Sequence, residues 1–96
     1  MTIFVRTEQI GSKLHRLLMF KDGKHLGEYE RSQAADIARK KAEIQDAEPT
    51  LLALFEKHGQ LLVRWDGKKR EKVVRSNGLK VGVIPKEAWK TPSWQQ

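Results

Sequence analysis

The sequence contains no cysteine among its 96 residues. This absence excludes a disulfide framework, a thiolate zinc site and a cysteine nucleophile, and it fits a reducing compartment. No apolar run approaches the roughly 18 residues that a membrane helix needs, and the N-terminus lacks a basic start followed by an apolar stretch. We therefore expect a cytoplasmic protein with no membrane partner.

Catalytic motifs are also missing. The three histidines, His15, His25 and His58, form no pair at positions i and i+4, so we expect no metal site. There is no phosphate-cradling glycine loop, nucleophile elbow or Ser-His-Asp order. A chain this short buries only about 60 to 65% of its unfolded surface, which leaves little room for a deep catalytic cleft. We expect a non-enzymatic protein that binds a partner and uses no cofactor.

Acidic residues are scarce in the last third of the chain. Residues 1–63 hold ten basic and nine acidic residues, whereas residues 64–96 hold nine basic and three acidic ones. Most of the formal net charge of +7 therefore lies in the last third of the chain. A positive potential on one side of a small domain attracts phosphate backbones, acidic proteins or anionic membranes. A lysine-rich strand can also be only a solvated face, and the composition leaves that reading open.

Apolar periodicity and turn residues predict six strands and two helices. Asp22-Gly23, Asp66-Gly67 and Asn77-Gly78 predict two-residue hairpin turns, because both central residues of such turns need positive φ. Ser32 is the expected N-cap of the first helix, and Gly59 is expected to end the second. Strands are expected at 3–5, 14–21, 25–30, 60–65, 69–75 and 79–84, and helices at 32–46 and 49–58.

This order, β-β-β-α-α-β-β-β, indicates an α+β fold in which two helices pack on one face of antiparallel sheet. We expect a single domain over residues 1–90, followed by an irregular tail at 91–96. The open edges at 3–5 and 79–84 leave a dimer possible, although Lys80 and Pro85 resemble edge protection.

The C-terminal strands predict one apolar face and one basic face. With two-residue loops, Arg64 pairs with Lys69 and Arg75 with Lys80. The like charges of Arg75 and Lys80 on neighbouring strands lower the stability of the sheet by about a few tenths of a kcal/mol or more, unless an anion relieves the repulsion. One face then holds Leu61, Val63, Trp65, Val74, Leu79, Val81 and Val83 as core. The other holds Arg64, Lys69, Arg75 and Lys80 around Leu62, Val73 and Ile84.

The basic face predicts a binding site for nucleic acid, with DNA favoured over RNA. Its central residues are Arg64, Lys69, Arg75 and Lys80, and Lys68, Lys72 and Lys86 extend it at the rim. The partner is expected to be the nucleic acid itself or a protein complex that processes it.

The segment from Leu26 to Ala38, LGEYERSQAADIA, resembles the strand-to-helix stretch of the integrase-arm and plant ethylene-response type DNA-binding domains. In that family a strand ending Leu-Gly-x-Phe/Tyr leads into an alanine-rich helix. The resemblance covers residues 1–46 and implies a three-stranded sheet plus a helix, with the sheet in the major groove. The arginine- and tryptophan-rich reading strands of the family are replaced here by residues 17–20, LLMF.

The chain as a whole, small, basic and free of cysteine, also resembles accessory proteins of bacteriophages, such as anti-RecBCD or anti-CRISPR proteins. That resemblance implies an alternative function, an inhibitor that docks on a host nuclease or effector complex by protein–protein contact. Trp89, Pro92 and Trp94 in the C-terminal tail are the expected docking residues, because exposed tryptophans commonly anchor protein partners.

Overall fold

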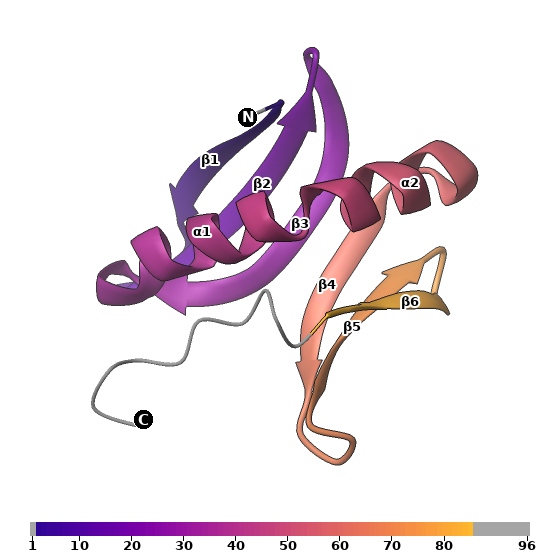
Figure 1. The fold of residues 1–96 in the computed structure, drawn as a ribbon. Coiled ribbons are helices and arrows are strands. Elements are labelled where there is room, and N and C mark those ends of the chain that lie inside the picture. The colour runs from indigo at the N-terminus through magenta and orange to yellow at the C-terminus, as the bar shows by residue number, and fades with distance from the viewer. Residues whose placement is uncertain (1, 86–96) are drawn as a thin grey trace.

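Two three-stranded meanders, one before and one after the helices, join edge to edge into a six-stranded sheet (Figure 1). A computed structural model describes residues 2–85 of the chain. The α+β class and the order β-β-β-α-α-β-β-β are confirmed. The first meander consists of β1 (Ile3–Gln9), β2 (Leu14–Lys21) and β3 (Lys24–Gln33), and the second of β4 (Leu61–Asp66), β5 (Glu71–Ser76) and β6 (Leu79–Ile84).

Both helices cover the same face of this sheet (Figure 1). They are α1 (Ile37–Asp46) and α2 (Glu48–His58), and a 3₁₀ turn (Ala34–Asp36) leads into α1. Neither helix of residues 2–85 is long and apolar enough to cross a membrane. The core between helices and sheet is one cluster: Ile3, Val5, Leu17, Met19, Leu26, Tyr29, Ile44, Ala47, Leu51, Leu61, Val63, Val74 and Ile84.

The two meanders meet through a short parallel pairing, so the sheet is mixed. Gly27 pairs with Leu61 and Glu28 with Leu62, whereas neighbouring strands within each meander are antiparallel as expected. The direction follows from the helical connection, which returns the chain to the end of the sheet from which β3 starts. Gly27 is required at the join, because a Cβ atom there would lie 2.0 Å from the Leu61 carbonyl oxygen.

Two of the three predicted hairpin turns are confirmed. Asp22 and Gly23 have φ of 51° and 78°, and Asn77 and Gly78 have φ of 52° and 80°. The prediction for Asp66-Gly67 is wrong, because residues 67–70 form a four-residue loop. The Asp66 carboxylate accepts hydrogen bonds from the backbone N–H groups of the next two lysines, and Arg70 instead takes the left-handed conformation, with φ of 56°.

The longer loop changes the strand pairing without changing the faces. Arg64 lies opposite Val73 rather than opposite Lys69. The register has moved by four residues, and because side chains alternate with a period of two, each residue keeps its side of the sheet. Leu61, Val63 and Val74 are therefore buried as predicted.

A β-bulge between β5 and β6 makes the buried residues of β6 differ from the predicted ones. Val74 rather than Val73 lies opposite Gly82, because β6 has one extra residue between the pairs Val74–Gly82 and Arg75–Lys80. Ile84 therefore points into the core, whereas Leu79 and Val83, which were predicted to be buried, are exposed. Val81 packs at the edge of the core.

The first helix starts later than predicted, whereas the second lies close to its predicted position. The Ser32 N-cap is wrong, because β3 continues through Ser32 opposite His15, and the Ser32 hydroxyl donates to the Gln33 carbonyl. The predicted end of the second helix at Gly59 is confirmed, and the helix begins one residue earlier than predicted, with Pro49 in its first turn. The domain boundary expected at residue 90 and the tail at 91–96 lie outside the described residues.

The parallel join predicts a strong glycine requirement. We expect Gly27→Ala to lower the free energy of unfolding by about 3 kcal/mol or more, because the new methyl group must displace the β4 backbone. Gly11→Ala is the matched control, since its Cβ would meet only Leu14 at 3.9 Å. Urea unfolding followed by circular dichroism measures both, and equal stability of the two variants would contradict the prediction.

Candidate nucleic-acid interface

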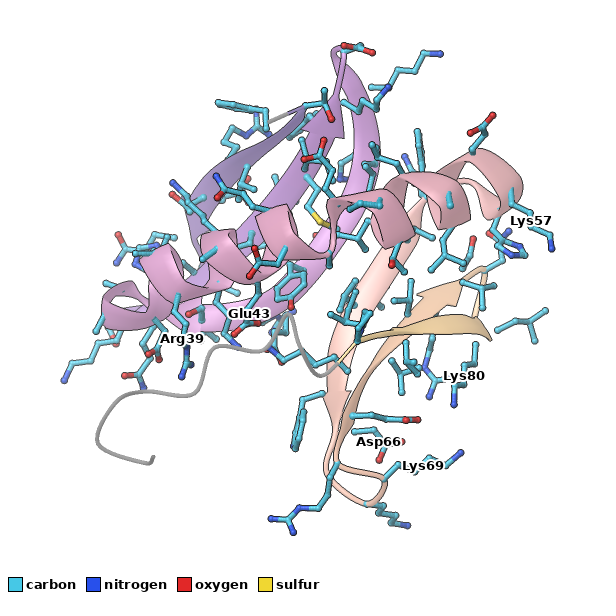
Figure 2. The ribbon with its side chains drawn as sticks, in the orientation of Figure 1. Arg39, Glu43, Lys57, Asp66, Lys69 and Lys80 are labelled. Atoms are coloured by element: carbon cyan, nitrogen blue, oxygen red, sulfur yellow. The ribbon has the colours of Figure 1, made fainter. Side chains whose placement is uncertain are left out.

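Basic side chains gather on the second meander, on the face turned away from the helices and on the loop that joins β4 to β5. We call Arg64, Lys68, Lys69, Arg75 and Lys80 the basic face, and all five are exposed. Figure 2 shows Lys69 at the loop and Lys80 on β6, both away from the helices. Arg75 lies opposite Lys80, as predicted.

The carboxylates on this face neutralise only part of its charge. Lys80 is paired with Glu71, at 3.0 Å between Nζ and Oε1, so an internal carboxylate relieves the repulsion between Arg75 and Lys80. The hydrogen bond from the Lys69 backbone N–H, helped by that of Lys68, holds the pKa of the Asp66 carboxyl below its usual range. The cations Arg64, Lys68, Lys69 and Arg75 form no ion pair with another residue of the described part.

Trp65 lies at the end of β4 and is 47% exposed, although it was predicted to be part of the core. It lines two concavities that also share Arg64. The first, of about 450 Å³, is completed by Lys68, Val73 and Arg75 together with Asp66 at the end of β4 and Gly67 in the loop. The second, of about 390 Å³, is completed by Glu30 and Arg31 of β3. Trp65 therefore has arginine or lysine neighbours on both sides.

Arg31 is a member of this site that the sequence analysis missed. It is exposed and lies in β3, whereas Trp65 lies in β4. Only the pairing of β3 with β4 brings the two together, and no local pattern in the sequence signals a parallel pairing between distant strands.

Two arginines on the outer face of the first meander already contact other side chains, in contrast to the cations of the basic face. Arg16 lies between Glu8 and Glu28, at 3.4 Å and 3.3 Å from their carboxylate oxygens. The Arg6 guanidinium lies over the Phe20 ring, 5.2 Å from its centroid. Arg64, Lys68, Lys69 and Arg75 of the second meander have no such contact among the ion pairs of the described residues.

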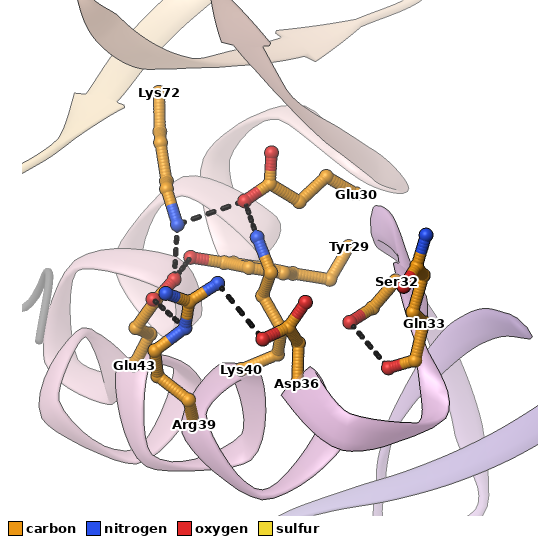
Figure 3. A network of polar contacts seen from close by, with 9 residues as sticks. All are labelled: Tyr29, Glu30, Ser32, Gln33, Asp36, Arg39, Lys40, Glu43 and Lys72. Atoms are coloured by element: carbon orange, nitrogen blue, oxygen red, sulfur yellow. Dashed lines mark hydrogen bonds and ion pairs between the residues drawn. The ribbon is translucent and has the colours of Figure 1, made fainter. Parts of the chain in front are cut away.

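Lys72 does not belong to the interface, which corrects the sequence-based assignment. Lys72 lies two residues before Val74 in β5, so both side chains are on the face of the sheet that the helices cover, and Lys72 is only 6% exposed. Figure 3 shows its ammonium group between the carboxylates of Glu30, at 2.8 Å, and Glu43, to which it donates a hydrogen bond. It also lies over the Tyr29 ring, 5.3 Å from the centroid.

The remaining contacts of this buried network satisfy its other charges (Figure 3). Lys40 of α1 donates to Glu30, and the Tyr29 hydroxyl donates to Glu43 at 2.9 Å. Burial raises the pKa of Glu30, but the hydrogen bonds and charges of Lys40 and Lys72 outweigh it, so the pKa lies below its ordinary value. Burial and the adjacent Glu43 carboxylate raise the pKa of Tyr29, which keeps its hydroxyl protonated as a donor.

Four predicted site residues, Lys86, Trp89, Pro92 and Trp94, lie outside the described residues. Within residues 2–85, no three His, Asp or Glu side chains are placed to hold a metal ion together. Comparisons with protein-family models, with curated proteins and with solved structures find no match to this chain.

The buried network predicts a large difference between two lysines of the second meander. Lys72→Ala leaves two carboxylates without their shared cation, so we expect the free energy of unfolding to fall by about 3–5 kcal/mol. Lys80→Ala, which removes a surface ion pair, should cost less than about 1 kcal/mol. Urea unfolding of both variants measures the difference, and a loss below about 1 kcal/mol for Lys72→Ala would show that the network does not stabilise the fold.

Glu30 predicts a loss of stability in acid. Its pKa in the folded chain lies below the ordinary value of 4.5, so its contribution is complete above about pH 4.5 and is lost as the pH falls through the folded pKa. Unfolding free energies measured from pH 6 downward should therefore fall more steeply for the wild type than for Glu30→Gln. Parallel curves for the two proteins would rule out Glu30 as a source of this pH dependence.

Proposed function

We propose that this chain is a non-enzymatic accessory protein that binds nucleic acid, or a complex that carries it, through the basic face. The observation that carries the proposal is the group of four exposed cations, Arg64, Lys68, Lys69 and Arg75, that have no carboxylate partner in residues 2–85. Cations of this kind release counterions from a phosphate backbone when they bind it.

The arrangement of these cations supports binding to a repeating polyanion. Arg64 and Arg75 project from neighbouring strands of the sheet, so their positions are fixed by strand pairing rather than by a mobile segment. Lys68 and Lys69 extend the charge onto the loop that follows β4. A rigid row of this kind matches several successive phosphates of one backbone.

The first meander supports the proposal less well. The resemblance of residues 1–46 to a DNA-binding family would place that sheet in the major groove. Two of its arginines, Arg6 and Arg16, already contact Phe20, Glu8 and Glu28. The third, Arg31 of β3, lines a concavity with Arg64 of the second meander. The contact surface that we propose is therefore β4–β6, with the first meander as support.

One observation favours the alternative, an inhibitor of the phage type that docks on a host nuclease or effector complex. Phe4 is 65% exposed on the edge strand β1 and lines a concavity of about 300 Å³ with Arg6 and Phe20. An exposed aromatic beside an arginine is the kind of anchor that protein interfaces use. This surface is remote from the basic face in the sheet order.

The proposal predicts that reversing two charges of the basic face removes binding. We expect Arg64→Glu/Arg75→Glu to weaken binding of labelled DNA by about two orders of magnitude, with an unchanged free energy of unfolding, because both side chains are exposed. Fluorescence anisotropy from low to physiological salt measures the affinity. For four phosphate contacts on duplex DNA, the wild type should show a log–log salt slope of about −3 to −4.

The matched control is Lys13→Glu/Lys41→Glu, which changes the net charge equally but lies away from the basic face, on exposed residues. It should retain most of the affinity. If both variants lost the same amount of affinity, the effect would come from the change in net charge and not from the position of the two arginines. A wild type that binds no nucleic acid at low salt would overturn the proposal and favour the alternative, in which the partner is a protein.

A further inference from the structure

The sheet of residues 2–85 ends in two edge strands, β1 on one side and β6 on the other, and they differ in how well they can pair with a further strand (Figure 1). The bulge between the pairs of Val74 and Arg75 interrupts the pairing of β6, and Pro85, which has no N–H group, follows that strand. In contrast, β1 pairs with β2 without a break from Ile3 to Gln9. A regular edge strand of this kind is a template for another strand.

The end of β1 shows which of its backbone groups face outward. The Ile10 N–H group donates to the Leu14 carbonyl of β2 at 2.9 Å. Because the backbone groups of successive residues in an antiparallel strand point to opposite sides, those of Arg6 and Glu8 also point toward β2. The N–H and C=O groups of Thr7 therefore point to the open edge, where no strand of residues 2–85 pairs with them.

The side chains of β1 are complementary to a second copy of the same strand. If two β1 strands pair antiparallel about a two-fold axis at Thr7, residues equally far before and after Thr7 face each other. Arg6 of each copy then lies opposite Glu8 of the other, and Phe4 lies opposite Ile10. The two Thr7 side chains meet at the axis, which is a favourable cross-strand pair. An axis at Arg6 or at Glu8 would instead place like charges opposite each other.

Both charges can make this contact, because neither is fully engaged within the chain. Arg6 and Glu8 are exposed. Arg6 contacts the Phe20 ring, 5.2 Å from the centroid, but forms no ion pair with another residue of the described part. Glu8 contacts Arg16 through Oε1, at 3.4 Å, so its second oxygen can accept from Arg6 of another copy.

Phe4 adds apolar surface to the same contact. It is 65% exposed and lies opposite Phe20 on the paired strand, where the two rings line a concavity of about 300 Å³. Ile10 is half-buried at the other end of β1. In a dimer with its axis at Thr7, each Phe4 ring is covered by Ile10 of the other copy, which removes apolar surface from water at both ends of the contact.

We propose that this chain forms a two-fold dimer through β1, in which the two sheets join edge to edge with Arg6 of each copy paired with Glu8 of the other. The inference does not rest on the proposed function, because the basic face belongs to β4–β6 at the opposite side of the strand order. A contact made by one strand from each copy lies at the low end of interface sizes, so we expect a dimer whose population depends on concentration.

Sedimentation equilibrium of the full chain, from about 5 μM to about 1 mM, measures the association. We expect a monomer–dimer equilibrium with a Kd of about 10–100 μM, the range of a small interface. A chain that stays monomeric at the highest concentration would overturn the inference and leave Phe4 to a different partner. Species larger than a dimer would overturn it too, because pairing about a two-fold axis closes the assembly.

Exchange of the two charges tests the register. Arg6→Glu alone and Glu8→Arg alone each place like charges opposite each other, so each should raise the Kd about 10-fold or more. An equimolar mixture of these two variants should dimerise again, because each copy then meets the opposite charge at both positions. The double variant Arg6→Glu/Glu8→Arg should also dimerise with itself. If neither the mixture nor the double variant recovers, the proposed pairing is wrong.

Two further variants separate backbone pairing from side-chain contact. Thr7→Pro removes an N–H group that β2 does not use, so the variant should fold, as judged by circular dichroism, and remain monomeric. A folded Thr7→Pro variant that dimerises like the wild type would exclude β1 as the interface. Phe4→Ala should weaken the dimer, whereas Leu79→Ala, which removes a side chain 71% exposed on the other edge strand, should not. Equal effects of the two alanine variants would contradict the inference.

Discussion

The ion pairs of Lys72 hold the two halves of the domain together. The meanders share only two residue pairs along β3 and β4, and Lys72 adds a link from β5 to Glu30 of β3 and to Glu43 of α1. Removing such charges from water costs several kcal/mol for each ion. Here the cost is offset because each carboxylate meets a cation, and because the Tyr29 hydroxyl satisfies Glu43 as well. The fold thus depends on a polar contact at the edge of an apolar core.

The same contact determines which charges reach the surface. Because Lys72 points toward the helices, strand alternation places Glu71 and Arg75 on the opposite face, around the buried Val73. The pairing with β4 places Arg64 on that face too. The buried network pairs two lysines, Lys40 and Lys72, with two glutamates, Glu30 and Glu43. On the outer face, Glu71 pairs with Lys80. What is left on the outside is an excess of positive charge. Core and candidate interface are therefore two faces of one strand register, and a shift by one residue would exchange them.

Local chemistry made much of this predictable from sequence, and the failures have physical causes. Asp22-Gly23 and Asn77-Gly78 satisfy the positive φ of their turns by themselves. At Asp66-Gly67 the carboxylate caps backbone N–H groups of a longer loop instead, an alternative that the same two residues allow. The even shift of register preserved the basic face. The same alternation makes the inward direction of Lys72 predictable, but its partners come from β3 and α1, which are distant in the sequence. The concavity that Arg31 shares with Trp65 likewise depends on the pairing of two distant strands, β3 and β4.

The order of strands in the sheet equals their order in the chain, and this has a consequence for folding. Each antiparallel pairing closes a loop of only a few residues, so most native contacts are local, and local contacts favour fast folding. The parallel join and the Lys72–Glu43 contact, 29 residues apart in sequence, require the ends of a long segment to meet. Gly27 and Lys72 each take part in one of these long-range contacts, so both lie where the chain must close a long loop before the domain is complete.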